Sequence, residues 1–127
     1  MRRASLAIGI ALNPSVLLLD EPTANLDIAT RKEILRTLSD MKSMTDTVMI
    51  ATHDMQLVCE WAERILVLSG GKLLKDGTRE EVFNDREVVR EAGIQPPEIY
   101  QMGKEIRPEI SCYTVDEFLH LFQREAV

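Results

Sequence analysis

The sequence predicts an α/β fold built on a parallel sheet, with a small helical extension at the C-terminus. Short apolar runs alternate with stretches of helical periodicity, which is the pattern of buried strands joined by crossover helices. The strand candidates are residues 16–19, 47–51 and 65–68. From Pro96 onward short helices are interrupted by turn signals, so we expect a division into residues 1–95 and 96–127.

The composition excludes several classes of function. The 127 residues are 45% hydrophobic and carry a formal net charge of -6, so a globular domain with a core is expected and a nucleic-acid partner is not. Cys59 and Cys112 are too few and too far apart for a disulfide framework, which fits a reducing cytosol. No apolar run reaches the roughly 18 residues of a membrane span, so membrane association is expected only through partners.

The first segment is predicted to be a buried helix. Residues 4–12 are apolar on nearly all sides and follow two arginines, an arrangement that imitates a secretory signal. No small-residue cleavage site follows, and Asn13-Pro14 ends the run because proline removes a donor and restricts the residue before it. We therefore expect a helix that is covered on most sides.

Two strands and a helix are expected next. Residues 16–19 form an unbroken apolar run, as in a strand buried on both faces, and end in Asp20 and Glu21. Asp27 is a suitable N-cap for a helix whose apolar stripe consists of Ile34, Leu35, Leu38 and Met41. His53 follows the strand at 47–51. Ligands of parallel sheets bind beyond the carboxyl ends of strands, where both acids and His53 fall.

The second half contains local signals for turns and caps. Asp54 is a candidate N-cap for the next helix. Gly70-Gly71, between two apolar runs, predicts a tight hairpin because both residues accept positive φ. Thr78 and Glu81 have the spacing of a capping box, and Thr114 and Glu117 repeat it before a final helix.

An apolar strand that ends in adjacent carboxylates has the Walker B arrangement. In such a site one acid supports Mg²⁺, usually through water, and the next polarises the attacking water. Adjacent side chains on an extended chain point in opposite directions, so Asp20 and Glu21 can serve different targets. Alone the pair is a weak signal, because many core strands end in solvated acids.

Together with the residues that follow, this pair makes the sequence resemble the nucleotide-binding subunits of ABC-type ATPases. The similarity covers LLLDEPTANLD at residues 17–27 and ATHD at 51–54, in the order of the family, and continues through the hairpin and helix at 65–83. It implies part of a P-loop NTPase (ABC ATPase) domain, namely its C-terminal half at residues 1–95. It also implies ATP and Mg²⁺ as cofactors.

The resemblance assigns a role to each matched residue. It implies that Asp20 supports Mg²⁺, that Glu21 is the general base, and that His53 contacts the γ-phosphate. It also implies a D-loop that touches the partner across the nucleotide, made of Ala24, Asn25, Leu26 and Asp27. The alternative interpretations are a solvated strand-end acid for Glu21 and a capping histidine in a loop for His53.

Other elements of the family do not occur in these 127 residues. There is no G-x-x-x-x-G-K-[ST] phosphate loop, and LSGGK at 68–72 follows His53 between two strand-like runs, so it is expected to be a hairpin and not the LSGGQ signature. We expect a fragment in which Met1 is an internal methionine. Without phosphate-loop amides, the acids face an anionic nucleotide unaided, and no measurable ATP turnover by this polypeptide alone is expected.

The tail indicates a branch of the family. Residues 92–106 and 111–122 resemble the C-terminal extension of energy-coupling-factor ATPases of cobalt- and vitamin-type importers. This implies pairing with a second ATPase subunit and a transmembrane coupling subunit at the cytoplasmic face of the membrane. A helical cap over the sheet edge is the alternative for the tail. Two other functions stay open for the chain: a noncatalytic module that pairs with an intact ATPase, and a DNA-repair or chromosome-type ABC ATPase.

Overall fold

The structure is a computed structural model that describes residues 2–123. The chain separates into two compact units, one ending at Asp54 and the other beginning at Met55, and each is described by itself. The division predicted at Pro96 lies inside the second unit and stays a prediction. Met1 and the last four positions of the expected extension, 124–127, lie outside the described residues.

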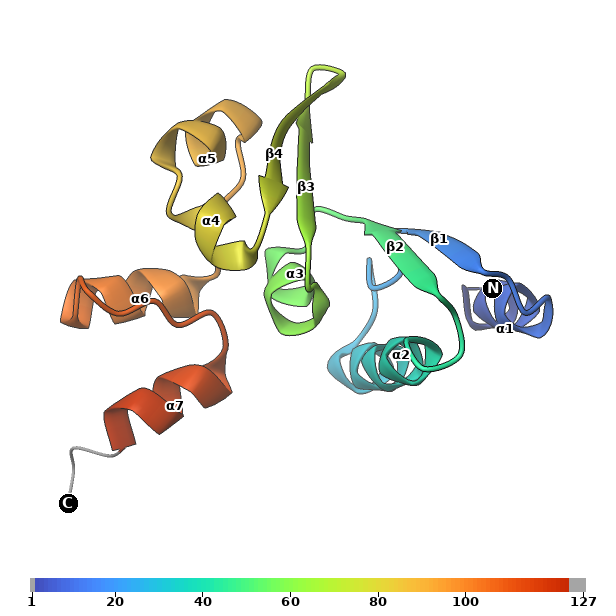
Figure 1. The fold of residues 1–127 in the computed structure, drawn as a ribbon. Helices are drawn as coiled ribbons and strands as arrows, with labels where there is room; N and C mark the ends of the chain where they lie inside the picture. Colours follow the sequence, from blue (N-terminus) through green and yellow to red (C-terminus); the bar gives the residue numbers. More distant parts are fainter. Residues whose placement is uncertain (1, 124–127) are drawn as a thin grey trace. The chain divides into compact units, whose positions relative to one another are not determined.

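The first unit is a two-stranded parallel sheet with two helices (Figure 1). Its elements are α1 (Arg2–Ala11), β1 (Val16–Asp20), α2 (Ile28–Met41) and β2 (Thr47–Ala51). β1 pairs with β2 from Val16 opposite Thr47 to Asp20 opposite Ala51. The predicted strand–helix–strand order and the parallel pairing are confirmed.

The start and the packing of α2 follow the prediction. The Asp27 carboxylate accepts a hydrogen bond from the Thr30 N–H at 2.9 Å, which satisfies one of the free donors at a helix start. The buried face of α2 consists of Ile34, Leu38 and Met41. Leu35, the fourth residue of the predicted stripe, is half-buried, so the buried stripe is narrower than predicted but keeps the spacing that the 3.6-residue period requires.

Two predictions of burial in this unit are wrong. In α1, Leu6 is buried but Ile8 is 64% exposed, so the helix is not covered on most sides. In β1, Leu17 is buried but Leu18 is 69% exposed, so the strand is not buried on both faces. Successive strand side chains point to opposite faces, and burying both requires a layer on each. Within the described residues only one face of β1 is covered.

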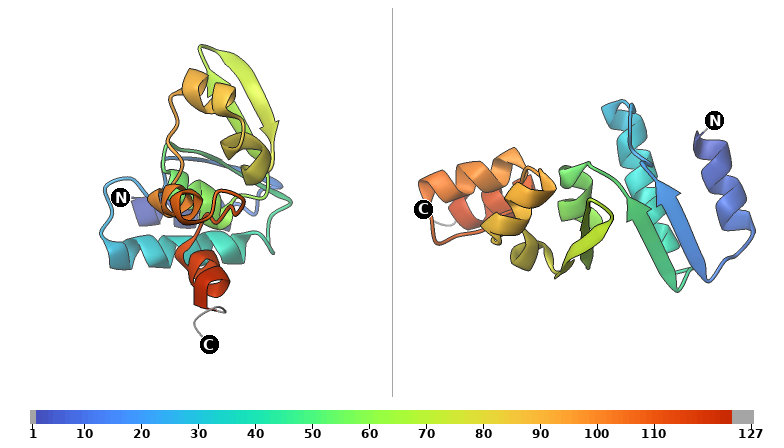
Figure 2. Two further views of the ribbon diagram at one scale, coloured as in Figure 1. Left: turned by 90° about the vertical axis from the view of Figure 1, so that its left-hand side faces the viewer. Right: turned by 90° about the horizontal axis from the view of Figure 1, so that it is seen from above.

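The second unit contains a β-hairpin and five helices within the described range (Figure 1). The elements are α3 (Met55–Trp61), β3 (Ile65–Ser69), β4 (Lys72–Gly77), α4 (Arg79–Phe83), α5 (Arg86–Ala92), α6 (Glu98–Ile106) and α7 (Val115–Gln123). Both α4 and α5 pack against the hairpin, as two further directions of view also show (Figure 2). No helix in the described part of the chain is long and apolar enough to cross a bilayer.

The hairpin turn at Gly70-Gly71 confirms the prediction made from the sequence. Gly70 and Gly71 have φ of 54° and 75°, the left-handed values that glycine adopts without steric cost. LSGGK is therefore a turn between strands. Membership of the parallel sheet stays a prediction for β3, because the pairing described within this unit is the antiparallel one with β4. The short turn brings β4 directly beside it, whereas a parallel partner requires a long crossover.

The predicted capping box is complete at α4, whereas the one at α7 differs from the prediction in one hydrogen bond. Thr78 and Glu81 form the complete capping box of α4. Before α7, the Thr114 hydroxyl accepts from the Glu117 N–H at 3.2 Å. The Glu117 carboxylate accepts from the N–H of Tyr113 at 2.8 Å, one residue earlier than a capping box predicts.

Candidate functional site

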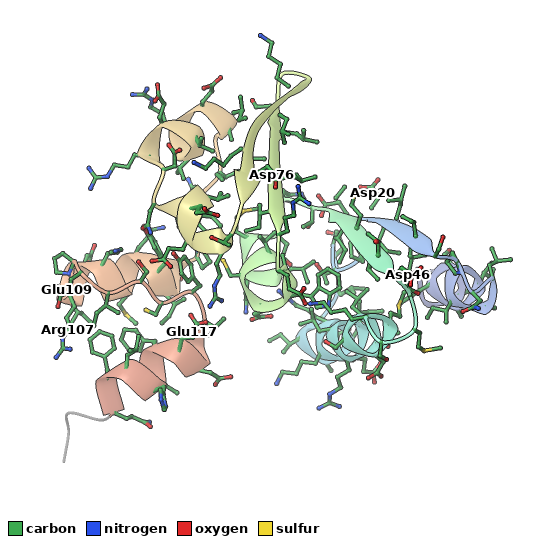
Figure 3. All side chains as sticks on the ribbon, viewed as in Figure 1. Asp20, Asp46, Asp76, Arg107, Glu109 and Glu117 are labelled. Carbon is green, nitrogen blue, oxygen red and sulfur yellow. The ribbon has the colours of Figure 1, made fainter. Side chains whose placement is uncertain are left out.

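The predicted acids lie at the end of β1. Asp20 is the last residue of the strand, and its side chain is exposed (Figure 3). The Glu21 N–H continues the pairing by donating to the Ala51 carbonyl at 2.8 Å. Glu21 then has φ of 44°, in the left-handed region that residues with a Cβ seldom adopt. The backbone therefore turns sharply at the residue predicted to be the base.

Glu21 and His53 are brought together, although 32 positions separate them in the sequence. The His53 N–H donates to Oε1 of Glu21 at 3.0 Å, and Nδ1 of the ring is hydrogen-bonded to the same oxygen. Thr52 Oγ1 donates to the other carboxylate oxygen at 2.8 Å. The Glu21 side chain is 29% exposed and that of His53 88%, so most of the imidazole is open to solvent.

These contacts set the charge state of Glu21. Partial burial acts to raise the pKa of the carboxyl, but the hydrogen bonds from Thr52 and His53, with the nearby charge of His53, outweigh it and hold the pKa below its usual value. Hydrogen bonds to the charged form favour that form. Glu21 is therefore a carboxylate at neutral pH, which is the state a general base needs.

A second group of side chains supports this pair. The Thr23 hydroxyl is buried and donates to Oδ2 of Asp54 at 2.9 Å. An Arg31 nitrogen lies 3.3 Å from the same oxygen. The Asp54 N–H donates to Thr52 Oγ1 at 3.0 Å, so the network reaches the residue that holds Glu21. It joins the turn after β1, the start of α2 and the segment after β2.

Sequence reasoning missed the functional position of this second group. Thr23 and Asp54 lie inside the two stretches that carry the family resemblance, directly beside the acids and His53. From the sequence, Asp54 is predicted only as a helix cap. A buried hydroxyl next to a carboxylate requires the three-dimensional pairing of β1 with β2, which brings together residues 31 positions apart. In the sequence, only their position next to the motif residues indicates that Thr23 and Asp54 could belong to the site.

The predicted D-loop forms the connection between β1 and α2. The Glu21 carbonyl accepts from the Ala24 N–H at 3.3 Å, which closes a turn with Pro22 at its second position, where proline is favoured. Asn25 is exposed and has φ of 57°. Both carboxylate oxygens of Asp27 are bound by Thr30, which lowers the pKa of Asp27. Its part in helix capping is thus established, while contact with a partner stays a prediction.

The arrangement fits a magnesium ion that is held mainly by water and phosphate. Among the described residues, no group of three or more His, Cys, Asp or Glu side chains could hold a metal ion. Nucleotide-bound Mg²⁺ needs no such group, since it commonly uses one or two carboxylates, several waters and the phosphates. The exposed carboxylate of Asp20 suits this purpose, whereas the oxygens of Glu21 already accept hydrogen bonds.

Comparison with known proteins identifies relatives of the chain. No protein-family model matches it. It is 37% identical over 106 residues to the energy-coupling factor transporter ATP-binding protein EcfA2 of Methanospirillum hungatei, covering 84% of the chain and 27% of that relative. It is 34% identical over 133 aligned positions to EcfA of Methanothermobacter thermautotrophicus, covering 98% of the chain and 43% of that relative. The chain thus spans less than half the length of these relatives.

Solved structures agree with this relationship. A bacterial Atm1-family ABC exporter with ATP bound matches with a TM-score of 0.60 and 29% identity, over 72% of this chain and 16% of that one. CbiO1 of Clostridium perfringens, part of the ABC transporter complex CbiONQ, matches with a TM-score of 0.53 and 35% identity, over 75% and 38%. The chain is therefore homologous to part of the ABC-type ATP-binding proteins, with relatives among those of energy-coupling factor transporters.

Proposed function

We propose that the chain provides the general base and the phosphate-contacting histidine of an ATP-hydrolysing subunit in an energy-coupling-factor-type importer of a vitamin or metal. The observation that carries the proposal is the hydrogen-bonded Glu21–His53 pair beside Asp20. In this assignment Asp20 would hold Mg²⁺ through water. When bound, ATP would supply the phosphoryl group and Mg²⁺ would neutralise part of its charge.

Glu21 and His53 have different roles in the proposed reaction. Glu21 is ionised and takes a proton from the attacking water, and its hydrogen bonds from Thr52 and His53 hold the carboxylate in place. His53 is fixed through Nδ1 and leaves Nε2 for the terminal phosphate. An imidazole between two anions can donate to both only when both nitrogens carry protons. In this assignment Nε2 of His53 would donate a hydrogen bond to the terminal phosphate, where charge develops.

A chimera tests this proposal. The chain replaces the matching stretch of the Methanothermobacter relative, to which it aligns over 98% of its length. We expect the chimera to hydrolyse ATP, and Glu21→Gln to lower turnover by a factor of about 100 or more while ATP still binds, since general-base catalysis contributes that much. Glu87→Gln, an exposed carboxylate on α5, is the matched control. An active chimera that tolerates Glu21→Gln would sink the assignment.

For the 127-residue polypeptide alone we propose no measurable ATP turnover. The phosphate loop, whose amides and lysine bind the nucleotide in such ATPases, does not occur in the sequence. Turnover by the polypeptide, abolished by Glu21→Gln, would contradict this. Turnover that survives the substitution would indicate a contaminating ATPase, so the two preparations are compared side by side.

Pairing with a second ATPase subunit is the remaining part of the proposal. The D-loop residues Ala24, Asn25, Leu26 and Asp27 and the extension at 96–127 are the proposed contacts, and a transmembrane coupling subunit would hold the pair at the cytoplasmic face of the membrane. The alternative, a noncatalytic module that pairs with an intact ATPase, requires the same contacts. Size-exclusion chromatography with the intact Methanothermobacter relative tests them: a stable mixed dimer supports pairing, and separate elution contradicts it.

A further inference from the structure

The second unit contains a cleft of about 780 Å³. Its walls come from α5, from the segment 93–96 and from α6. This volume lies in the range of roughly 300–1,000 Å³ that is usual for small-molecule sites. None of the residues assigned to ATP hydrolysis lines it, so the proposed ATP chemistry leaves the cleft unexplained.

The lining combines apolar surface with positive charge. The apolar part consists of Phe83, Val89, Ile94, Pro96, Tyr100 and Pro108. The charged lining residues in the described part of the chain are Arg86, Arg90 and Lys104. All of them are cations, in a chain whose formal net charge is -6. The cleft is therefore a local positive site on an acidic protein.

The two arginines are available to a ligand. Arg86 and Arg90 are four positions apart on α5, so they lie on the same side of the helix. Both are exposed, and no carboxylate of the described residues lies within ion-pair distance of either. The neighbouring acid Asp85 pairs with Lys75 at 3.0 Å instead. The guanidinium groups thus retain their capacity to bind an anion in fork geometry.

The third cation, Lys104, comes from α6 and is held in place by two contacts. The ammonium group of Lys104 donates to the Pro108 carbonyl at 3.0 Å and lies 5.7 Å from the centre of the Tyr100 ring. The Tyr100 hydroxyl in turn donates to the Asn84 side chain at 2.8 Å. These contacts fix an ammonium group and an aromatic ring next to each other, which limits the ordering cost of binding.

We propose that this cleft binds a small phosphate ester. Two guanidinium groups and one ammonium group match a phosphate, which has nearly two negative charges and three acceptor oxygens. A carboxylate has one charge and two oxygens, so it would leave part of the cluster without a partner. The apolar surface at Ile94 and Tyr100 lies beside the cations and favours an ester with an apolar group over inorganic phosphate.

Amide NMR spectra of the full 127-residue chain test the proposal with phenyl phosphate, inorganic phosphate and benzoate as probes. We expect phenyl phosphate to shift the amide signals of Gly93, Ile94 and Gln101 and to bind more tightly than the other two. Arg86→Gln with Arg90→Gln should weaken phenyl phosphate by roughly tenfold or more, because charge-assisted hydrogen bonds are lost. The matched control, Arg36→Gln with Lys72→Gln, changes the net charge equally and should bind like the wild type.

The outcomes separate clearly. The proposal is overturned if these amides do not shift, if benzoate binds as tightly, or if the control pair weakens binding as much as the α5 pair. If the α5 variant does not fold, Lys104→Gln on α6 is used instead, and it should also weaken phenyl phosphate binding. Vesicles containing phosphatidic acid show whether the phosphate can also come from a lipid headgroup. Glu21→Gln should retain the amide shifts caused by phenyl phosphate. The cleft is therefore tested independently of the proposed ATP hydrolysis.

Discussion

The N–H of His53 donates to Oε1 of Glu21 at 3.0 Å, and the imidazole binds the same oxygen through Nδ1. The backbone and the ring of one residue thus hold one carboxylate oxygen of another. Movement of the segment after β2 therefore moves the Glu21 carboxylate with it. Such coupling gives the proposed base one defined orientation, and a water molecule can be deprotonated only from a fixed direction and distance.

Removing the Thr52 hydroxyl should raise the pKa of Glu21. Thr52→Val keeps the shape of the side chain but deletes a hydrogen bond to the charged form of the Glu21 carboxyl. Titration of the Glu21 carboxyl carbon by NMR measures the change. Thr47→Val, at an exposed position in β2, is the control and should leave this titration unchanged. An unaltered Glu21 titration in Thr52→Val would show that His53 alone sets its charge state.

Glu21 should also make stability depend on pH. Its pKa is lower in the folded chain than the ordinary value of 4.5, so its contribution to the free energy of unfolding is present above that value. The contribution is lost as the pH falls through the folded pKa. The free energy of unfolding in urea is measured at pH 7 and at pH 3. Its decrease between these two pH values should be smaller for Glu21→Gln than for the wild type. Glu87→Gln is the control and should behave like the wild type. An equal decrease for Glu21→Gln and the wild type would contradict this linkage.

The buried Thr23–Asp54 hydrogen bond should stabilise the first unit. Thr23→Val leaves an Asp54 oxygen with one donor fewer, and we expect a loss of about 1 kcal/mol in the free energy of unfolding. A double-mutant cycle with Asp54→Ala isolates the pair, with a coupling of roughly 0.5–1 kcal/mol. If the two losses simply add, the contact contributes nothing of its own.

Arg79 should hold the C-terminal helix to the rest of the second unit. Its guanidinium donates to the Cys59 carbonyl at 2.9 Å, binds Glu117 at the start of α7 and lies 4.8 Å from the centre of the Tyr113 ring. Lysine cannot reproduce this planar set of contacts. Arg79→Lys should therefore accelerate amide hydrogen exchange throughout α7. Arg36→Lys on α2 is the control, and unchanged exchange in Arg79→Lys would contradict this role.

Local sequence signals predicted two of the caps and the hairpin turn correctly. The Asp27 cap, the Thr78–Glu81 box and the turn at Gly70-Gly71 depend on residues close together in the chain, so propensity and spacing are sufficient to predict them. The proximity of Glu21 to His53 also followed, because parallel strands end at the same edge. That prediction needed only the strand order.

Burial and side-chain support could not be predicted in the same way. The apolar run in β1 indicates a strand, but whether Leu18 is buried depends on which layers cover the sheet. Thr52 has no sequence feature that distinguishes it from a solvated threonine. Its hydrogen bond to Glu21 exists because β1 and β2 pair in one register, which is a property of the folded chain.

The backbone conformation at Glu21 makes this position sensitive to selection for stability. A residue with a Cβ at φ of 44° costs on the order of 1–3 kcal/mol, and glycine or asparagine would relieve part of it. Both replacements delete the carboxylate. A library screened only for resistance to heat or protease would therefore enrich variants at position 21 that have lost the proposed base, whereas a screen for ATP turnover in the chimera would retain glutamate.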